Sequence, residues 1–216
     1  MEKLVIFDCD GVLVDSETLS LRALVECLKD HGVLKHENQF SPLAYKGAKL
    51  SVILETIERE TGSKLPTDFE KKYRAHLDFL FATDLKAIAG VASALAQIPH
   101  RLCVASSGPL EKIERSLSLT RLSHHFDRNL FSSYTVQSWK PDPGIFSYAA
   151  KNMGSEPKDC IVIEDAILGI QAALKADMRA LAFVPDGNDS DFASLGVATF
   201  SSMVDLPKLI EESFLS

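Results

Sequence analysis

Several features that would mark particular classes of protein are missing from this sequence. None of its uncharged apolar runs approaches the roughly 18 residues of a membrane span, so we expect no contact with a membrane. The first apolar run, at 4–7, meets Asp8 too early for a signal peptide, so we expect no secretory leader. The 11 glycines and 9 prolines are too few for a collagen-like or low-complexity chain.

Cysteine is also sparse. The four cysteines show no CxxC pairing and lie in apolar or helical patterns: Cys9, Cys27, Cys103 and Cys160. A disulfide framework is not expected at this length and density, so these patterns predict buried free thiols in a reducing cytoplasm.

Positive charge is in deficit. The 23 basic residues against 30 acidic ones leave a formal charge of −7, whereas nucleic-acid-binding proteins present clustered positive charge. We therefore expect no nucleic-acid partner, although a few local lysines would suffice for a small anionic substrate. Hydrophobic residues at 46% and charged residues at 25% are typical of a globular chain.

Short apolar runs alternate with helical patterns along most of the chain. The runs predict strands at 4–7, 102–105, 129–132, 160–163, 180–184 and 198–200. Helical spacing predicts helices at 88–98, 110–119, 143–153 and 166–176, followed by a C-terminal helix. Strands that are apolar throughout and alternate with helices indicate an α/β fold with a Rossmann-like parallel sheet, covered on both faces.

One stretch interrupts this alternation. Residues 16–83 contain only helical patterns, from Ser16 to Gly32, at 51–60 and at 66–81. We therefore expect an α/β core made of residues 1–15 and 84–216, with residues 16–83 inserted as a small all-helical domain.

Polar residues follow the predicted strands, where parallel α/β sheets bind their ligands. They are Asp8, Cys9, Asp10 and Gly11 after the first strand, Ser106 to Gly108 after the second, and Glu164 and Asp165 after the fourth, with Lys140 in a turn. Two carboxylates about 4 Å apart repel by about 4 kcal/mol at an effective dielectric constant near 20, so such a cluster calls for a cation. Oxygen ligands of this kind favour Mg²⁺.

Each of these motifs also has an ordinary interpretation. Asp-x-Asp-Gly opens calcium-binding loops, but here Val12 stands where a ligand is needed and a strand precedes the motif. Ser-Ser-Gly is common in turns, and Lys140 before a proline is often solvated. The acids at 164–165 would also favour a helix dipole. Their joint occurrence in this order favours a single site.

In this order the motifs resemble those of the haloacid dehalogenase superfamily of phosphotransferases. The matching segments are 7–16, 104–109, 139–143 and 162–173, and the helical insertion resembles the cap of that family. Segments 46–50 and 137–143 are most similar to those of its bacterial sugar-phosphate phosphatases. The resemblance implies hydrolysis of a small phosphate monoester, for example a sugar phosphate such as 6-phosphogluconate, with Mg²⁺ as cofactor.

The resemblance also implies roles for individual residues. Asp8 would be the nucleophile that forms an aspartyl-phosphate; at its reference pKa of about 3.9 it is ionised without a separate base. Asp10 would be the general acid and base, with a raised pKa in the complex. The metal ligands would be Asp8, the Asp10 carbonyl and Asp165, with Glu164 binding directly or through another ligand.

The phosphate and substrate contacts are implied in the same way. Ser106, Ser107 and Lys140 would bind the phosphoryl group, Ser107 through its backbone amide. In the cap, Lys46, Gly47 and Lys49 would meet the substrate, although two solvated lysines are an equally ordinary interpretation. The partner is expected to be a small phosphorylated metabolite, and the chain a cytoplasmic monomer or weak dimer.

Other activities are less consistent with these residues. A mutase resembling β-phosphoglucomutase shares the motifs but carries a histidine where Ser20 stands. A dehalogenase lacks the carboxylate of Asp10, and a phosphonate-cleaving enzyme has Asp-x-Ala-Gly in the first motif. A non-catalytic phosphoacceptor module also assembles acids, a hydroxyl and a lysine around magnesium, but it has no place for an inserted helical domain.

Overall fold

A computed structural model describes residues 3–34, 50–187 and 189–215 of the chain. It divides into two compact units: Met1–Asp15 with Lys86–Ser216, and Ser16–Leu85. The first is called the α/β unit below and the second the helical unit. The insertion extends two residues further along the chain than the sequence pattern predicts.

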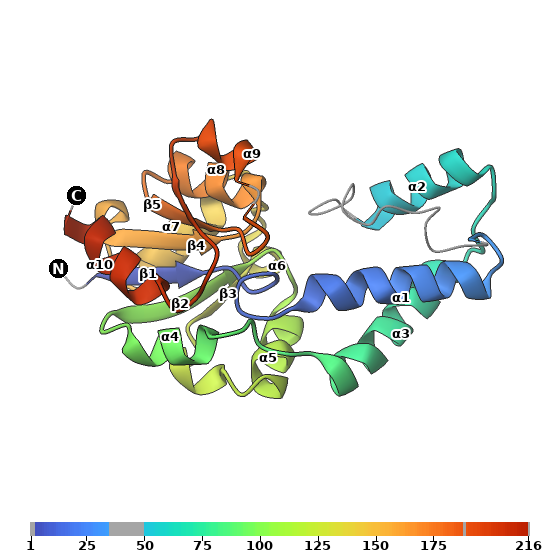
Figure 1. The fold of residues 1–216 in the computed structure, drawn as a ribbon, viewed down its shortest axis with the longest axis horizontal. Helices are drawn as coiled ribbons and strands as arrows, with labels where there is room; N and C mark the ends of the chain where they lie inside the picture. Colours follow the sequence, from blue (N-terminus) through green and yellow to red (C-terminus); the bar gives the residue numbers. More distant parts are fainter. Residues whose placement is uncertain (1–2, 35–49, 188, 216) are drawn as a thin grey trace. The chain divides into compact units, whose positions relative to one another are not determined.

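The α/β unit is built on a sheet of six parallel strands within the described residues (Figure 1). The strands are β1 (Leu4–Phe7), β2 (Arg101–Ser106), β3 (Leu130–Ser132), β4 (Cys160–Glu164), β5 (Arg179–Phe183) and β6 (Ala198–Phe200). Their spatial order is β3-β2-β1-β4-β5-β6. The strand order reverses beside β1, because β2 and β3 are added on one side of it and β4 to β6 on the other. Ligands of such folds bind at the carboxyl ends of the strands at this point. The predicted Rossmann-like parallel sheet is confirmed.

Helices cover the sheet because its strands are apolar on both faces. One face is covered by α7 (Gly144–Asn152) and α8 (Ile167–Lys175), whose buried residues form a single core with alternate residues of the central strands, such as Leu4 and Ile6. Intervening residues such as Phe7 point to the other side, where Phe7 meets Phe126 edge to face at 6.1 Å. The buried core therefore holds the ends of β1 and β4 rigidly.

The remaining helices of the α/β unit differ in part from the predictions. They are α4 (Val91–Gln97), α5 (Leu110–Leu119), α6 (Ser133–Val136), α9 (Ser190–Ala193) and α10 (Leu206–Leu215). The helix predicted at 88–98 is shorter, because Gly90 before its first residue has φ of 82°. The sequence pattern missed α6 and α9, which are each a single turn and too short to show a helical period.

The helical unit contains α1 (Ser16–Asp30), α2 (Leu50–Thr61) and α3 (Phe69–Asp84). Its apolar core includes Leu24 and Leu28 of α1 together with Phe69 and Leu80 of α3. The start predicted for α3 at Pro66 was wrong. Pro66 instead accepts a hydrogen bond from the Phe69 amide at 2.9 Å, which forms a turn before the helix.

The two ends of the insertion meet within the α/β unit. The Asp15 amide donates to the Lys86 carbonyl at 3.0 Å, and the Ile88 amide donates to the Leu13 carbonyl at 3.0 Å. An antiparallel bridge joins Val14 and Ala87 between them. The chain therefore leaves the α/β unit and returns to it at one place, just beyond the loop that follows β1.

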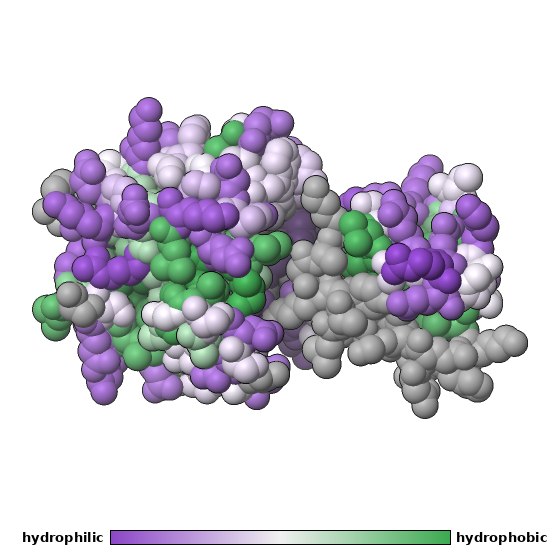
Figure 2. Space-filling view, turned by 90° about the horizontal axis from the view of Figure 1, so that it is seen from above, coloured by the Kyte–Doolittle hydropathy of each residue, from purple (hydrophilic) through white to green (hydrophobic). Residues whose placement is uncertain are grey.

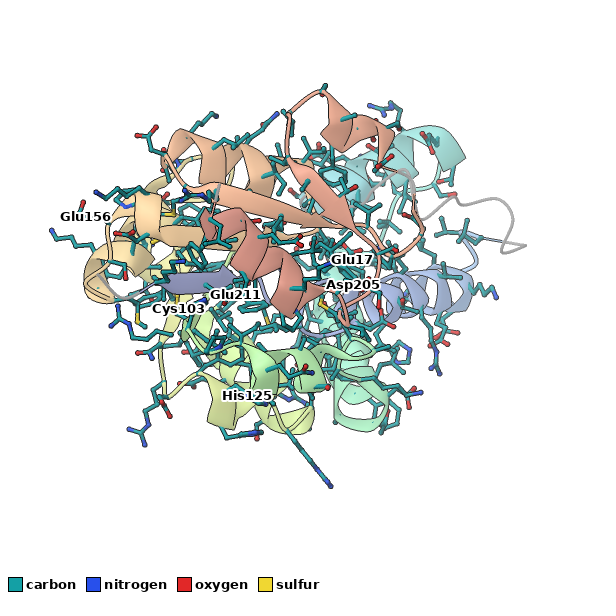
Figure 3. The ribbon with its side chains drawn as sticks, turned by 60° about the vertical axis from the view of Figure 1, so that its left-hand side comes forward. Glu17, Cys103, His125, Glu156, Asp205 and Glu211 are labelled. Carbon is teal, nitrogen blue, oxygen red and sulfur yellow. The ribbon has the colours of Figure 1, made fainter. Side chains whose placement is uncertain are left out.

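The surface and the thiols agree with the sequence. Figure 2 shows a largely hydrophilic surface interrupted by an apolar area on the α/β unit, an ordinary feature of folded proteins. No helix within the described ranges is long and apolar enough to span a bilayer. All four cysteines are free and buried, as predicted, and Cys103 lies within the sheet (Figure 3).

Candidate active site

The loop after β1 carries Asp8 and Asp10 at the carboxyl edge of the sheet. Asp8 is buried, and its amide donates to the Ile163 carbonyl of β4 at 3.0 Å. Gly11 turns the loop with φ of 81°, and its amide donates to Val14 at 2.9 Å. A Cβ atom at Gly11 would lie 2.2 Å from Asp165 Oδ2, so only glycine lets the Asp165 carboxylate approach this loop so closely.

Lys140 joins the ends of β1 and β4. Its Nζ donates to Asp8 Oδ1, and it donates to Glu164 Oε1 at 2.6 Å. The side chains of Lys140, Asp8 and Glu164 are 7%, 9% and 2% exposed, so they form a buried ion-pair cluster. Glu164 accepts a further hydrogen bond from the Ala166 amide at 2.8 Å through its other oxygen. Because each partner holds the next, the lysine ammonium is fixed beside the Asp8 carboxylate.

The buried cluster alters how its members ionise. Burial raises the pKa of Asp8 from 3.8 to about 7; the charge of Lys140 opposes this rise, and the charges of Glu164 and Asp10 add to it. Burial also raises the pKa of Glu164. Burial alone would lower the pKa of Lys140, but the two carboxylates outweigh it and raise that pKa. The sequence-based expectation that Asp8 ionises at its reference pKa thus changes: its anionic form depends on neighbouring positive charge.

Lys140 owes its position to a short loop before α7. The Lys140–Pro141 peptide bond is cis, and the Asp142 amide donates to the Trp139 carbonyl at 2.9 Å. Asp142 Oδ1 accepts from Ser138 Oγ at 2.5 Å and from the Gly144 amide at 2.8 Å. Trp139 packs edge to face on Tyr134, with ring centroids 5.7 Å apart.

The two serines at the end of β2 differ in burial. Ser106 is 1% exposed and its Oγ accepts from the Gly108 amide at 3.2 Å, whereas Ser107 is exposed. Ser132 of β3 donates to the Gly108 carbonyl at 2.6 Å, which secures the loop from the neighbouring strand. Ser106 is therefore the serine whose hydroxyl lies at the end of the buried strand.

Sequence reasoning missed Lys112. Its Nζ lies 2.7 Å from Asp10 Oδ2, and Asp10 sustains the raised pKa of Lys112 against the opposing effect of burial. The feature of the sequence that could have indicated Lys112 is its position, six residues after Ser106 and in the first turn of α5. A lysine in the first turn interacts unfavourably with the helix dipole, so helix stability does not account for a lysine at this position.

The substrate residues predicted in the insertion are not placed. Lys46, Gly47 and Lys49 lie outside the described residues, so their predicted roles stay predictions.

The predicted magnesium site can be tested against the donor groups. In the part of the chain that the structure describes, no group of three or more His, Cys, Asp or Glu side chains is arranged to hold a metal. The predicted ligands are the side chains of Asp8 and Asp165 and the Asp10 carbonyl, with Glu164 binding directly or through another ligand. These are oxygen donors, and the buried Asp165 carboxylate approaches the loop that carries Asp8 and Asp10, where a Cβ atom at Gly11 would lie 2.2 Å from its Oδ2. The donor set fits Mg²⁺ in its chemistry.

The chain thus combines a Rossmann-like sheet with a buried Asp–Lys–Glu cluster at its carboxyl edge, and comparison with known families places it among hydrolases. Residues 2–177 match the model of the haloacid dehalogenase-like hydrolase family. The chain therefore belongs to this family, as the motifs predicted.

Individual relatives support the same placement. The chain is 37% identical to the 6-phosphogluconate phosphatase of Escherichia coli K12, over 95% of this chain and 93% of that protein. It is 26% identical to hexitol phosphatase B of the same strain, over 93% and 92% of the two chains. Among solved structures, a haloacid dehalogenase-like protein from Agrobacterium tumefaciens superposes with a TM-score of 0.84 at 28% identity, covering 98% and 99% of the two chains.

Proposed function

We propose that this protein is a magnesium-dependent phosphatase that hydrolyses a sugar phosphate through an aspartyl-phosphate intermediate. The observation that carries the proposal is the contact of the buried Lys140 ammonium with Asp8, at the carboxyl end of β1. The reaction class follows from the family and from relatives named as phosphatases. The relative named 6-phosphogluconate phosphatase makes that sugar acid phosphate the first substrate to test.

The first chemical step uses Asp8 and Asp10. An oxygen of Asp8 forms a bond to phosphorus while the ester P–O bond breaks, and Asp10 gives its proton to the leaving oxygen. Lys140 neutralises charge on Asp8 and on the transferring phosphoryl group, and Ser106 donates a hydrogen bond to a phosphoryl oxygen.

The second step releases the phosphate. Water attacks phosphorus and gives its proton to Asp10, while the bond between Asp8 and phosphorus breaks. Inorganic phosphate leaves, and both aspartates return to their starting states. Glu164 contributes by holding Lys140 at 2.6 Å, so that the ammonium stays beside Asp8 throughout.

A magnesium ion held by Asp8, Asp165 and the Asp10 carbonyl would add positive charge beside the phosphoryl oxygens. It would also favour the anionic form of Asp8 that attack requires. The helical unit, with Lys46, Gly47 and Lys49, is proposed as the cap that selects the substrate.

A mutase is less favoured by the described residues. At the position where such mutases carry a histidine, Ser20 donates its hydroxyl to the Ser16 carbonyl at 2.8 Å within α1. A hydroxyl used in this way offers no group that titrates near neutral pH to handle a proton of a bound sugar.

The test is phosphate release from a panel of sugar phosphates, with and without Mg²⁺. We expect turnover of at least one sugar phosphate that chelation abolishes, and none by Asp8→Asn at the same protein concentration. If the unmodified protein is as silent as Asp8→Asn on every ester, the proposed function is wrong.

A further inference from the structure

Lys112 occupies a position that helix stability does not explain. It is the third residue of α5, where a positive charge opposes the helix dipole. The neighbouring Glu111 has the sign that such a position favours. A lysine here therefore has to be accounted for by what its ammonium contacts.

The ammonium contacts the carboxylate proposed as the general acid. Lys112 Nζ lies 2.7 Å from Asp10 Oδ2, across 102 residues of sequence. The side chains of Lys112 and Asp10 are 36% and 28% exposed, so the ion pair is partly buried at the edge of the site. An ion pair that is partly buried is screened less than one on the open surface.

The loop between β2 and α5 sets this contact beside the phosphoryl position. A Cβ atom built on Gly108 would lie 3.5 Å from Lys112 Cδ, 3.6 Å from Ser106 Oγ and 3.9 Å from Asp10 Oδ2. Three groups from two elements and a loop thus surround Gly108. The same loop is secured from β3 by Ser132.

We infer that Lys112 is a positioning residue, which orients the Asp10 carboxyl for proton transfer to the leaving group and from the attacking water. The inference rests on the proposed phosphatase function. Asp10 is a short side chain beside Gly11, which has φ of 81°, and it is the least buried member of the proposed machinery on this loop. A charged hydrogen bond to Oδ2 restricts rotation of the carboxyl group, and the proton that Asp10 transfers then has to reside on Oδ1.

This role differs from that of a phosphate ligand. Lys140 already supplies a buried ammonium beside Asp8, whereas the contact made by Lys112 is with Asp10. Proton transfer requires the donor within hydrogen-bond reach of the leaving oxygen, and an error of about 1 Å costs roughly 10²-fold in rate. Lys112 should therefore matter most where the leaving group needs a proton.

The test compares two esters of similar shape. Phenyl phosphate releases a phenol whose pKa is about 10, like that of tyrosine, and depends on protonation by the enzyme. 4-Nitrophenyl phosphate releases a much more acidic phenol and depends on it less. The values of kcat and KM are measured for both esters, and for a sugar phosphate that the unmodified protein hydrolyses.

We expect Lys112→Met to lower kcat for phenyl phosphate and for the sugar phosphate by about 10–100-fold. The loss on 4-nitrophenyl phosphate should be at least tenfold smaller, with KM little changed. Lys112→Arg, which keeps the charge, should recover much of the lost rate. In an Asp10→Asn background, Lys112→Met should cost nothing further, because the group it orients is gone.

A matched control is Lys208→Met, which removes an exposed lysine that lies 3.5 Å from Glu212 and should leave both esters unaffected. Equal losses on both esters, or a loss confined to KM, would mean that Lys112 binds phosphate or supports the loop, and the inference would be wrong. An unchanged rate in Lys112→Met and in Lys112→Gln would overturn it as well. Absence of turnover by the unmodified protein would overturn the proposed function, and this inference with it.

Discussion

Asp8 and Glu164 are carboxylates whose negative charge is unfavourable inside the protein, and Lys140 is the cation that they share. Burial lifts the pKa of Asp8 from 3.8 to about 7, which disfavours the form that the proposed chemistry needs. Active sites commonly keep such groups at a cost in stability. The cost should be measurable by removing the charge without changing the shape of the side chain.

Asp8→Asn should therefore abolish turnover and still fold. Between pH 3.8 and about 7, unfolded Asp8 has lost its proton and folded Asp8 has kept it, so a rise in pH favours unfolding of the unmodified protein. The side chain at this position does not titrate in Asp8→Asn. The free energy of unfolding of the variant, relative to that of the unmodified protein, should therefore increase across that pH range and level off above it. Urea unfolding at pH 5 and pH 8, without metal or phosphate, measures the difference. A constant difference would contradict the raised pKa.

Lys140→Met should damage both activity and stability. It leaves two buried carboxylates facing each other without their cation, and breaking a buried ion pair in this way costs about 3–5 kcal/mol. We expect loss of turnover by at least about 10³-fold and a clear fall in the urea midpoint. Lys151→Met, at an exposed position of α7, is the matched control and should change neither. Unaltered stability in Lys140→Met would show that the carboxylates are not held as described.

At the scale of elements, α8 begins immediately after the site and has to leave room for it. Gly169 lies in the first turn of this helix, and a Cβ atom there would lie 1.9 Å from Glu164 Oε1. Glu164 cannot move away without losing the contacts with Lys140 and the Ala166 amide. The glycine in α8 is thus required by the carboxylate at the end of β4.

Gly169→Ala should reverse the usual effect of this substitution. Helix propensity alone predicts stabilisation by about 1 kcal/mol. The clash with Glu164 should instead destabilise the protein by about 1–3 kcal/mol and lower turnover. Urea unfolding compares it with Ser147→Ala, at an exposed position of α7, which should be nearly neutral. A stabilised, fully active Gly169→Ala would contradict the close approach.

At the scale of the whole molecule, the insertion is closed off by hydrogen bonds on the α/β side. The Asp15 amide and the Lys86 carbonyl lie 3.0 Å apart, beside an antiparallel bridge between Val14 and Ala87. This geometry allows residues 16–85 to be replaced by a two-residue Asn-Gly turn. The sheet and the core that includes Leu4, Ile6 and Phe146 lie within the α/β unit itself.

We expect the shortened protein to fold cooperatively and to lose turnover of sugar phosphates, because the proposed cap is missing. Slow hydrolysis of 4-nitrophenyl phosphate should remain, since the Asp8, Lys140 and Glu164 cluster lies entirely in the α/β unit. Circular dichroism with urea unfolding tests the fold, and phosphate release tests the activity. A non-cooperative transition would show that the two units form one folding unit.

The agreement between sequence and structure depends on the range of the interactions involved. Each apolar run lies within a few residues of a strand, because burial on both faces requires a continuous apolar segment. The pattern misplaced the start of α3 and missed α6 and α9, where a turn and two single-turn helices carry too few residues to show a period. The paired serines after β2 looked equivalent in sequence, yet only Ser106 is buried.

The sequence by itself determined the family, the parallel α/β core and the acids, hydroxyl and lysine that follow its strands, because these depend on local patterns and on motif order. Only the tertiary structure decided which of these groups meet. Lys140 contacts Asp8 across 132 residues, and Lys112 contacts Asp10 across 102, since β1 lies between β2 and β4. These ion pairs form only because elements distant in sequence pack together, and no local sequence pattern indicates which elements do so.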